Sequence, residues 1–316
     1  MKKISCYLFL LLILVTACDG HKNAITRMDT PTSGEAMIVC DECFAPIIEE
    51  EIAVFTGLNM DAFITPIYTS EAEAFKLFLE DSIRTLIVTR ELTLAEKEHI
   101  KSMKLTPRSQ KIAIDGIALI IHPDNKDSLI SLSAIQKIIL GEYKDWNDFT
   151  ETKSVSPRPL TVVFDNPNSS TVRFIKDSIC KGQTMSKDLL AADSNKAVID
   201  YVASHPNAIG IIGVNWISNI KDTNQLNFIN TIQTMAVSRE DIPTYANSYK
   251  PYPAYFANGD YPLTRDVYIH LTDVRGGLPA GFVAFVAGDS GQRIILKAGL
   301  VPATRPTRLI NIQENF

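Results

Sequence analysis

The stretch KIAIDGIALIIH, residues 111–122, decides the fold of this 316-residue chain. It is a long apolar run, interrupted by the acid Asp115 and the glycine Gly116. The run is long enough to cross from one domain to another. A carboxylate in such a place either accepts a proton-bearing group of a ligand or caps a neighbouring loop. The residues leave both interpretations open for Asp115.

Strands and helices alternate on both sides of this stretch. Short apolar runs predict strands at residues 37–40, 63–68, 85–89, 160–164, 209–214 and 266–271. Helical patterns occupy residues 44–55, 71–80, 93–102, 131–140, 171–180, 187–192, 195–204 and 279–298. Regular alternation of this kind is typical of an α/β protein with a mainly parallel sheet.

The start of the chain indicates where the protein works. Lys2 and Lys3 precede an apolar run over residues 7–15, which is the pattern of a secretion signal. Small residues then stand in front of Cys18, as they do where bacterial lipoproteins are cut and acylated. We therefore expect a signal peptide at residues 1–17 and a lipid on Cys18, which anchors the protein in the cell envelope, on the periplasmic side. The alternative is an ordinary signal with an incidental cysteine.

Bulk composition excludes several classes of function. The formal net charge is −5, and no stretch is dense in lysine or arginine, so we expect no nucleic-acid partner. The five histidines are scattered singly, which indicates no metal site. No pattern of a hydrolase nucleophile or triad is visible, so we expect neither an enzyme nor a cofactor. Residues 18–36 are largely polar and aperiodic and predict a flexible tether.

The segment CDEC, residues 40–43, is formally a C-x-x-C motif in an exported protein. A thiol-disulfide enzyme is one possible use of Cys40 and Cys43. The two intervening acids, however, raise the pKa of a thiol, whereas a nucleophilic thiolate needs a lowered one. Two small residues at a crowded strand end are the favoured interpretation.

Ligands of open α/β sheets bind at the carboxyl ends of the strands. Four predicted strand ends carry polar residues, of which the segment DNPNSST, residues 165–171, is the most informative. Asn168, Ser169, Ser170 and Thr171 lie over the first turn of a helix, where free N–H groups and hydroxyls favour an anion. The alternative is that Asn168 or Ser169 only caps the helix.

Arg90 follows the strand at residues 85–89. Its guanidinium is able to donate two hydrogen bonds to an oxyanion. An ion pair with a nearby acid, such as Glu91 or Glu96, is equally compatible with the sequence.

Several stretches, taken together and in order, carry a resemblance to a known family. They are residues 111–118, the segment 131–146 with Ile139, Gly141 and Trp146, the loop at 168–171, the strand at 207–213, and the stretches 261–265, 281–282, 291–292 and 297–299. In this order they resemble the type II periplasmic solute-binding proteins, in particular the phosphate-binding proteins of phosphate ABC transporters.

The resemblance implies two α/β lobes joined by two crossovers that act as hinges, with phosphate held between the lobes. It places residues 37–116 and 257–316 in lobe one and residues 117–256 in lobe two. Lobe one would contribute the backbone N–H of Cys43, with Ser70, Thr89 and Arg90. Lobe two would contribute Ser169, Ser170 and Thr171. The implied protein is a monomer that hands phosphate or a similar oxyanion to an ABC permease.

Three departures from the family pattern concern charge and space. Asp165 stands where the family often has an arginine, and Arg90 stands where it often has an acid. Ser170 replaces a loop glycine, which restricts close approach of the backbone. Asp41, Glu42 and Asp165 would repel a dianion unless one of them points away or accepts the ligand's proton. The alternative function is therefore an envelope sensory or interaction protein that keeps the fold but has lost phosphate.

Overall fold

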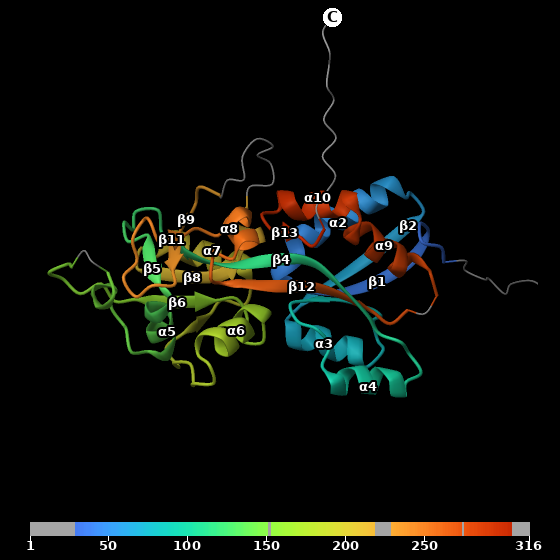
Figure 1. Ribbon diagram of the computed structural model, residues 1–316, viewed down its shortest axis with the longest axis horizontal. Coiled ribbons are helices and arrows are strands. Elements are labelled where there is room, and N and C mark those ends of the chain that lie inside the picture. The colour runs from blue at the N-terminus through green and yellow to red at the C-terminus, as the bar shows by residue number, and fades with distance from the viewer. Residues whose placement is uncertain (1–28, 151–152, 219–228, 274, 305–316) are drawn as a thin grey trace, which may run out of the picture.

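The computed structural model describes residues 29–150, 153–218, 229–273 and 275–304. Two long strands, β4 (Arg108–Ile121) and β12 (Thr264–Leu271), run through the middle of the molecule and join two groups of elements (Figure 1). β4 pairs with β12 as far as Gly116, and from Ile117 onward it pairs with β8 (Ala208–Gly213). The 111–122 stretch thus passes from one lobe to the other, as its length predicts.

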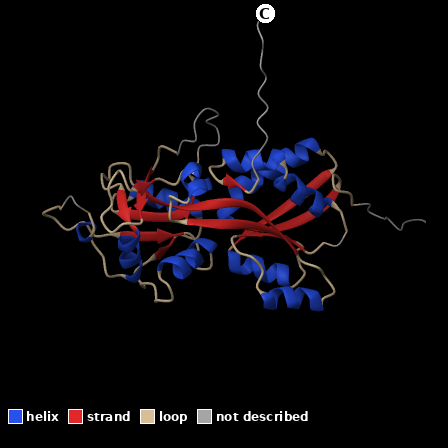
Figure 2. Cartoon of the chain, viewed as in Figure 1, coloured by secondary structure: helices blue, strands red, loops and turns tan. Residues whose placement is uncertain are grey.

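Lobe one holds the strands in the order β2-β1-β3-β12-β4. The first three are parallel, and β12 is antiparallel to its neighbours β3 and β4. Helices cover both faces (Figure 2). The remaining elements of this lobe are β1 (Gly34–Asp41), η2 (Glu42–Phe44), α2 (Ala45–Leu58), β2 (Ala62–Thr69), α3 (Glu71–Leu79), β3 (Thr85–Val88), α4 (Leu94–Ser102), α9 (Leu278–Ala287), α10 (Asp289–Lys297) and β13 (Val301–Pro302).

Lobe two continues the sheet in the order β4-β8-β6-β7, and a small sheet β11-β10-β5 lies beside it. β6 is parallel to both β7 and β8. Besides β8, the strands of lobe two are β5 (Leu129–Ser131), β6 (Thr161–Phe164), β7 (Leu190–Ala191), β9 (Gln233–Thr234), β10 (Ala236–Ser238) and β11 (Ser248–Tyr249). Its helical elements are α5 (Leu132–Leu140), η3 (Trp146–Asp148), α6 (Ser170–Phe174), η4 (Ile175–Ile179), α7 (Asn195–Ser204), η5 (Val214–Trp216) and α8 (Pro253–Asn258).

The two crossovers are bonded to each other where the lobes meet. The backbone nitrogen of Ile117 donates to the carbonyl of Leu263 at 2.8 Å, and the Tyr261 hydroxyl donates to the Ile117 carbonyl at 2.7 Å. A Cβ at Gly116 would lie 2.2 Å from the ring of Phe256 in α8, so the glycine lets α8 pack against β4. The α/β class predicted from the alternation of elements is confirmed.

Apolar side chains on both faces of the sheet form the core. One large cluster lies under α2, α9 and α10 and continues through β4 into lobe two. A second cluster, which includes Phe75, Phe78, Leu86 and Ile100, lies between the sheet and the helices α3 and α4. Both faces of the sheet are therefore covered in each lobe, and the apolar clusters lie between the sheet and its helices.

Three local predictions need correction. Residues 34–36 do not belong to a tether, because they pair with residues 62–64 as the start of β1. The predicted helix at 187–192 is wrong: Leu190 and Ala191 form β7, since the free edge of β6 offers them hydrogen-bond partners. The predicted helix at 171–180 is divided into α6 and the π-helical turn η4. Cys18 and the signal segment lie outside the described residues.

Candidate functional site

Strand ends from both lobes meet at one buried polar cluster. β1 ends at Asp41, and the chain then enters η2 and α2. β6 ends one residue before Asp165, and the loop after it leads into α6. Asp41 and Asp165 are both almost fully buried, at 0% and 1% exposure. The carboxyl ends of strands thus form the site, as expected for an open α/β sheet.

Arg265 of β12 lies at the centre of this cluster, which we name the Arg265 cluster: Asp41, Cys43, Asp115, Asp165, Ser169, Ser170, Thr171, Asn195, Asn215 and Arg265. Its Nε donates to Asp115 Oδ2 at 2.9 Å, and its Nη1 donates to Ser170 Oγ at 2.8 Å. Its Nη2 is buried and has no hydrogen-bond partner among the described residues. The guanidinium therefore ties the crossover strands to the α6 loop and keeps one donor free.

Direct contacts cross from lobe one to lobe two within the cluster. The backbone nitrogen of Ser170 donates to Asp41 Oδ2 at 3.3 Å, while Asp41 Oδ1 accepts from the backbone nitrogen of Cys43 at 3.1 Å. The Cys43 thiol donates to Asp165 Oδ2 at 3.3 Å and lies 3.2 Å from Thr171 Oγ1. The side chains at the two strand ends are therefore in mutual contact.

Two asparagines complete the cluster. Asn195, at the start of α7, donates to Glu42 and to Asp165. Asn215, just after β8, donates to the Cys43 carbonyl at 2.8 Å. The Oδ1 atoms of both asparagines are buried without a partner among the described residues. The cluster thus contains a guanidinium donor and two amide acceptors that have no partner among the described residues.

Gly213 brings the backbone of β8 close to these groups. An added Cβ would lie 3.2 Å from Asn215 Nδ2 and 3.7 Å from both Arg265 Nη2 and Asp115 Oδ2. A glycine at this position therefore leaves space directly beside the unpaired donor.

The charges of the cluster are unbalanced. Arg265 is the only lysine or arginine among the buried residues of the described chain, whereas three aspartates are buried beside it. Burial, together with the charge of Glu71, raises the pKa of Asp41 to about 7, although Arg265 opposes the shift. Burial also raises the pKa of Asp115 and of Asp165 above its ordinary value. Asp41 can therefore take up a proton near neutral pH.

Five of the residues predicted from sequence lie in the Arg265 cluster: Cys43, Asp115, Ser169, Ser170 and Thr171. Thr89 lies beside the cluster, where its backbone nitrogen and hydroxyl donate to Glu71. Ser70 caps α3 by accepting from the backbone nitrogen of Glu73 at 3.4 Å. The Asn168 side chain is exposed, and only its carbonyl reaches lobe one, where it accepts from Ala72 N at 3.4 Å.

The structure places Arg90 away from the cluster. Its two terminal nitrogens donate to both oxygens of Glu96, at 2.8 and 2.7 Å, and its guanidinium lies 3.6 Å from the centre of the Phe75 ring. The ion pair that the sequence allowed as an alternative is therefore the observed arrangement. The buried arginine of the site comes instead from β12.

Sequence reasoning missed Arg265, Asn195 and Asn215. Each is a single polar residue beside an apolar strand or at a helix start, and none forms a local motif. One signal was available for Arg265, because it is the direct cross-strand partner of Asp115. Pairing the 111–122 stretch with the strand predicted near residue 266 would have placed the two charges side by side.

The cysteines of the C-x-x-C motif are free thiols in the structure, as is Cys180. Burial and the neighbouring acids Asp41 and Glu42 raise the pKa of Cys40 well above its ordinary value, and burial with Asp41 and Asp165 does the same for Cys43. Both thiols thus stay protonated, which opposes the thiolate chemistry of a disulfide oxidoreductase.

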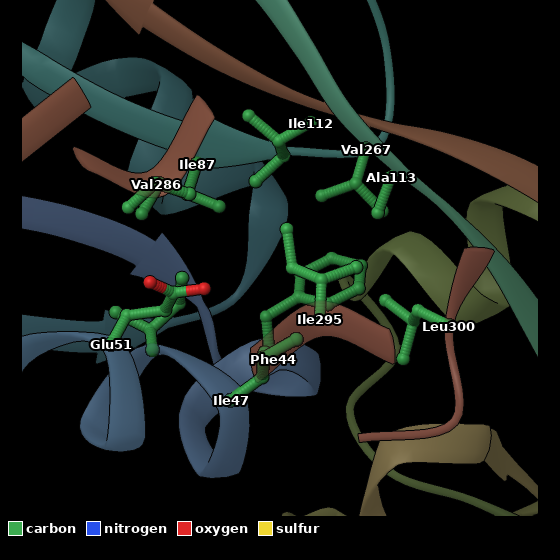
Figure 3. Close-up of a pocket in the computed structure, with 11 residues that line it drawn as sticks. Phe44, Ile47, Glu51, Ile87, Ile112, Ala113, Val267, Val286, Ile295 and Leu300 are labelled. Atoms are coloured by element: carbon green, nitrogen blue, oxygen red, sulfur yellow. The ribbon is translucent and has the colours of Figure 1, made fainter. Parts of the chain in front are cut away.

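One buried carboxyl group lies outside the cluster. Glu51 of α2 faces a small cavity of about 10 Å³ whose other lining residues, among them Phe44, Ile87 and Ile295, are apolar (Figure 3). Neither carboxylate oxygen has a hydrogen-bond partner among the described residues. Burial, with the charge of Glu50, raises the pKa of Glu51 to about 8. Glu51 is therefore a neutral core residue at neutral pH.

The described residues contain neither a metal-binding group nor a membrane-spanning helix. No group of three or more histidine, cysteine, aspartate or glutamate side chains there is placed to hold a metal ion. No helix in the described part of the chain is both long and apolar enough to cross a membrane.

Comparison with curated proteins gives distant relatives. The chain is 22% identical over 317 residues to the phosphate-binding protein PstS of Bacillus subtilis, and the match covers 96% of each chain. It is 21% identical over 209 residues to PstS of Pseudomonas aeruginosa. That second match covers 62% of this chain and only 60% of the relative's length.

Solved structures share the fold. A Clostridium perfringens protein crystallised with bound phosphate superposes with a TM-score of 0.72 at 19% identity, covering 86% of this chain and 100% of the other. An ABC-type phosphate transport receptor from Vibrio cholerae superposes with a TM-score of 0.62 at 16% identity, covering 85% and 100%. The resemblance noted in the sequence is confirmed at the level of fold. The family model of the PBP superfamily domain matches residues 26–290, most of the chain, so this protein belongs to the PBP superfamily and has the two-lobe α/β fold of type II periplasmic binding proteins.

Proposed function

We propose that this protein is a solute-binding protein that captures phosphate, or a similar partly protonated oxyanion, between its two lobes for an ABC permease. The observation that carries the proposal is the buried guanidinium of Arg265, which keeps its Nη2 donor free where the crossovers and the α6 loop meet. Asp115 already balances the charge of Arg265, but a buried N–H donor without a partner is costly unless a ligand oxygen accepts from it.

The polar groups around Arg265 suit an oxyanion that still carries protons. Arg265 Nη2 and the hydroxyls of Ser170 and Thr171 are donors for the negatively charged oxygens. The buried Oδ1 atoms of Asn195 and Asn215 are acceptors for the ligand's O–H groups. Phosphate near neutral pH has both kinds of oxygen, whereas a fully deprotonated anion such as sulfate has only acceptors.

The charge of the cluster favours the same class of ligand. With Asp41, Asp115 and Asp165 all ionised, an entering anion meets more negative than positive charge. The raised pKa values of these acids allow protons to be shared between carboxylates and ligand. The names of the relatives, two of them phosphate-binding proteins PstS, support phosphate as the member of this class.

Closure and opening would rotate the lobes about the two crossovers. β4 changes its partner between Gly116 and Ile117, and the returning chain is bonded to Ile117 through Tyr261 and Leu263. We place the hinge at these residues, with the described residues of 34–116 and 257–304 in lobe one and those of 117–256 in lobe two. This is a hinge motion of the kind that ligand-binding proteins with two lobes use.

The proposal extends to location and chemistry. The protein works in the cell envelope as a monomer, catalyses no reaction, and is anchored by a lipid on Cys18 after removal of residues 1–17. Fractionation tests the anchor: the Cys18→Ala chain should leave the membrane fraction, while the unmodified chain stays in it. Equal membrane retention of both chains would overturn the lipid anchor and leave the ligand proposal untouched.

Titration calorimetry with inorganic phosphate tests the ligand. The protein is first unfolded and refolded to remove bound solute. We expect saturable heat with phosphate that is lost in Thr171→Ala, whose hydroxyl lies in the cluster, and retained in Thr56→Ala, whose hydroxyl donates to the Ile52 carbonyl within α2. Absence of heat with phosphate, sulfate and other oxyanions would overturn the proposal.

A second candidate function is an envelope sensory or interaction protein that keeps the fold without phosphate. The observation that favours it is the excess of buried acids over cations in the cluster. Neighbouring genes distinguish the two: permease and ATPase genes beside this one support transport. An isolated gene, together with a silent calorimetric titration, supports the second candidate.

A further inference from the structure

A second group of charged side chains joins the lobes beside the Arg265 cluster. Glu71 is the first residue of α3, and its side chain is 4% exposed. Its carboxylate accepts from Thr89 N at 3.0 Å and from Thr89 Oγ1 at 2.7 Å, both at the end of β3 in the same lobe. Glu71 is thus held in a fixed position by its own lobe.

Arg173 reaches this carboxylate from α6 in the other lobe. Its Nε donates to Glu71 Oε2, and its Nη2 donates to Glu71 Oε1 at 3.3 Å and to Thr89 Oγ1 at 2.6 Å. Within its own lobe the Arg173 guanidinium also lies 3.5 Å from Asp177. A bidentate pair with a prepositioned carboxylate is the strong form of such a contact.

The side chains of Glu71 and Arg173 bond to each other and to Thr89, and the charge of Glu71 acts on Asp41 in the Arg265 cluster. Neither Glu71 nor Arg173 donates to or accepts from Arg265, Asp115 or Ser170 in any hydrogen bond of the described chain. A surface groove of about 470 Å³, lined in part by Glu71, Asn168 and Arg173, runs beside them. Solvent therefore reaches the arginine, whose side chain is 33% exposed, but hardly the carboxylate.

We propose that Glu71 and Arg173 form a clasp between the lobes, which stabilises the closed arrangement through a contact that no ligand atom makes. A backbone hydrogen bond next to the clasp, from Ala72 N to the Asn168 carbonyl at 3.4 Å, also joins the two lobes and would form and break together with the clasp. Lobe opening separates the arginine from a buried carboxylate that Thr89 keeps in place.

The charge state of the pair supports this role at neutral pH. Burial raises the pKa of Glu71, but the hydrogen bonds and charge of Arg173, with those from Thr89, outweigh it and leave the pKa below its ordinary value. The clasp therefore persists as an ion pair wherever the lobes are closed. The ion pair shifts the equilibrium between open and closed arrangements toward the closed one, whichever ligand binds in the Arg265 cluster.

The clasp predicts a change in closure without a change in the ligand contacts. Apparent affinity scales with the fraction of molecules in the binding-competent arrangement. We expect Arg173→Gln to shorten the mean lifetime of the closed arrangement about tenfold and to weaken phosphate binding by a similar factor. Arg173 is the better target, because its partial exposure lets the variant fold.

Single-molecule fluorescence transfer measures the closed lifetime. Dyes are attached through p-acetylphenylalanine incorporated at positions 101, in α4 of lobe one, and 187, in lobe two, both exposed in the structure. The full chain is measured with and without inorganic phosphate. The control is Arg158→Gln, which breaks a pair with Asp127 at 2.6 Å and similar burial inside lobe two. That control should leave the lifetime unchanged.

The double variant tests whether the two residues act together. With Glu71→Gln and Arg173→Gln combined, we expect no further shortening beyond the larger single effect. A lifetime in Arg173→Gln equal to that of the unmodified chain, or an equal shortening in Arg158→Gln, overturns the clasp. A closed lifetime that shortens in Arg173→Gln, while phosphate changes it in neither chain, would support the clasp and overturn phosphate as the ligand.

Discussion

Arg265 and Asp115 form an ion pair at 2.9 Å whose side chains are only 3% and 0% exposed. They are direct cross-strand partners on β12 and β4, the two strands that join the lobes. The pair therefore fixes the guanidinium at the hinge, while Nη1 reaches Ser170 at the start of α6. On the proposed function, movement of either lobe would change the surroundings of the same cation, and ligand binding would thereby be coupled to closure.

Arg265→Gln should abolish tight phosphate binding. The substitution removes the cation that would face the ligand, and truncating one partner of a buried, hydrogen-bonded charge pair across a binding interface costs about 2–5 kcal/mol. It also leaves Asp115 unpaired, which lowers stability. That binding cost corresponds to roughly a 30- to 4000-fold rise in the dissociation constant. Titration calorimetry measures the rise, and urea unfolding measures the accompanying loss of stability.

The double variant Arg265→Gln/Asp115→Asn separates binding from stability. Neutralising the stranded acid should restore much of the stability, because no uncompensated charge remains buried. It should not restore binding, since the donor is still missing. An Arg265→Gln chain that binds phosphate within threefold of the unmodified chain would contradict the role assigned to the guanidinium.

Phosphate affinity should weaken as pH rises through about 7. Burial and the charge of Glu71 raise the pKa of Asp41 to about 7, so this acid is largely neutral below that pH and ionised above it. Its ionised form repels an anion held by Ser170 and Arg265. Calorimetry between pH 5.5 and 8.5 measures the slope, and Asp41→Asn should flatten it.

Phosphate itself loses a proton in the same pH range. The test is therefore the difference between the pH slopes of affinity in the unmodified chain and in Asp41→Asn. The part of the slope that belongs to phosphate remains in Asp41→Asn, and only the part that belongs to Asp41 disappears. Identical slopes in the two chains would show that Asp41 does not titrate in this window.

Ser169→Ala should weaken both the helix and the site. Ser169 caps α6 by accepting from Val172 N at 3.2 Å, and its hydroxyl donates to Asp165 Oδ1 at 2.6 Å. Loss of the cap costs about 1 kcal/mol of stability. Asp165 Oδ1 also loses the hydroxyl that donates to it, so the negative charge of this carboxylate is less well satisfied and disfavours a bound anion. Ser131→Ala is the matched control, because Ser131 caps α5 by accepting from Ala134 N at 3.1 Å, outside the cluster.

We expect a loss of unfolding free energy in both serine variants, larger in Ser169→Ala by the lost hydrogen bond to Asp165, and a loss of phosphate affinity in Ser169→Ala alone. Urea unfolding and calorimetry on the same preparations give both numbers. If Ser131→Ala lowered the affinity as much as Ser169→Ala, the effect would belong to general stability rather than to the α6 loop.

Much of the fold follows from patterns that are local in sequence. Apolar runs and helix caps predict most of the elements. A run such as residues 111–122 is apolar enough to be buried in the core, and this follows from its own composition rather than from the segments that pack against it. The failures are non-local. The strand Leu190–Ala191 exists because the edge of β6 is free, and residues 34–36 join β1 because residues 62–64 lie beside them.

The site divides in the same way. The 165–171 loop can be recognised from local sequence features, namely a strand end, turn residues and three hydroxyls. In the structure Ser169, Ser170 and Thr171 are buried between the lobes. Arg265 gives no such signal, since its role comes from pairing with Asp115, 150 positions earlier. Arg90 is the opposite case, because its position at a strand end predicts a ligand contact that the structure does not show. Both of its terminal nitrogens donate to the neighbouring Glu96 instead.

Stability should fall with rising pH because of a carboxyl group far from the ligand. Burial, with the charge of Glu50, raises the pKa of Glu51 from 4.5 to about 8. A group with a raised folded-state pKa contributes stability that is fully present below its unfolded pKa and is lost as pH rises through the folded pKa. The loss should therefore accumulate between about pH 4.5 and 8, at up to roughly 1.4 kcal/mol per pH unit.

Glu51→Gln should remove this pH dependence, because the amide keeps the size of the side chain and does not ionise. Glu51→Met should go further and raise stability at pH 8, since an apolar group suits the cavity lined by Phe44, Ile87 and Ile295 (Figure 3). Glu49→Gln, at an exposed position of the same helix, is the control that leaves the profile unchanged. Urea unfolding from pH 5 to 9 measures all four chains. A Glu51→Gln profile parallel to that of the unmodified chain would mean that Glu51 is ionised inside the core, with the carboxylate solvated through its cavity.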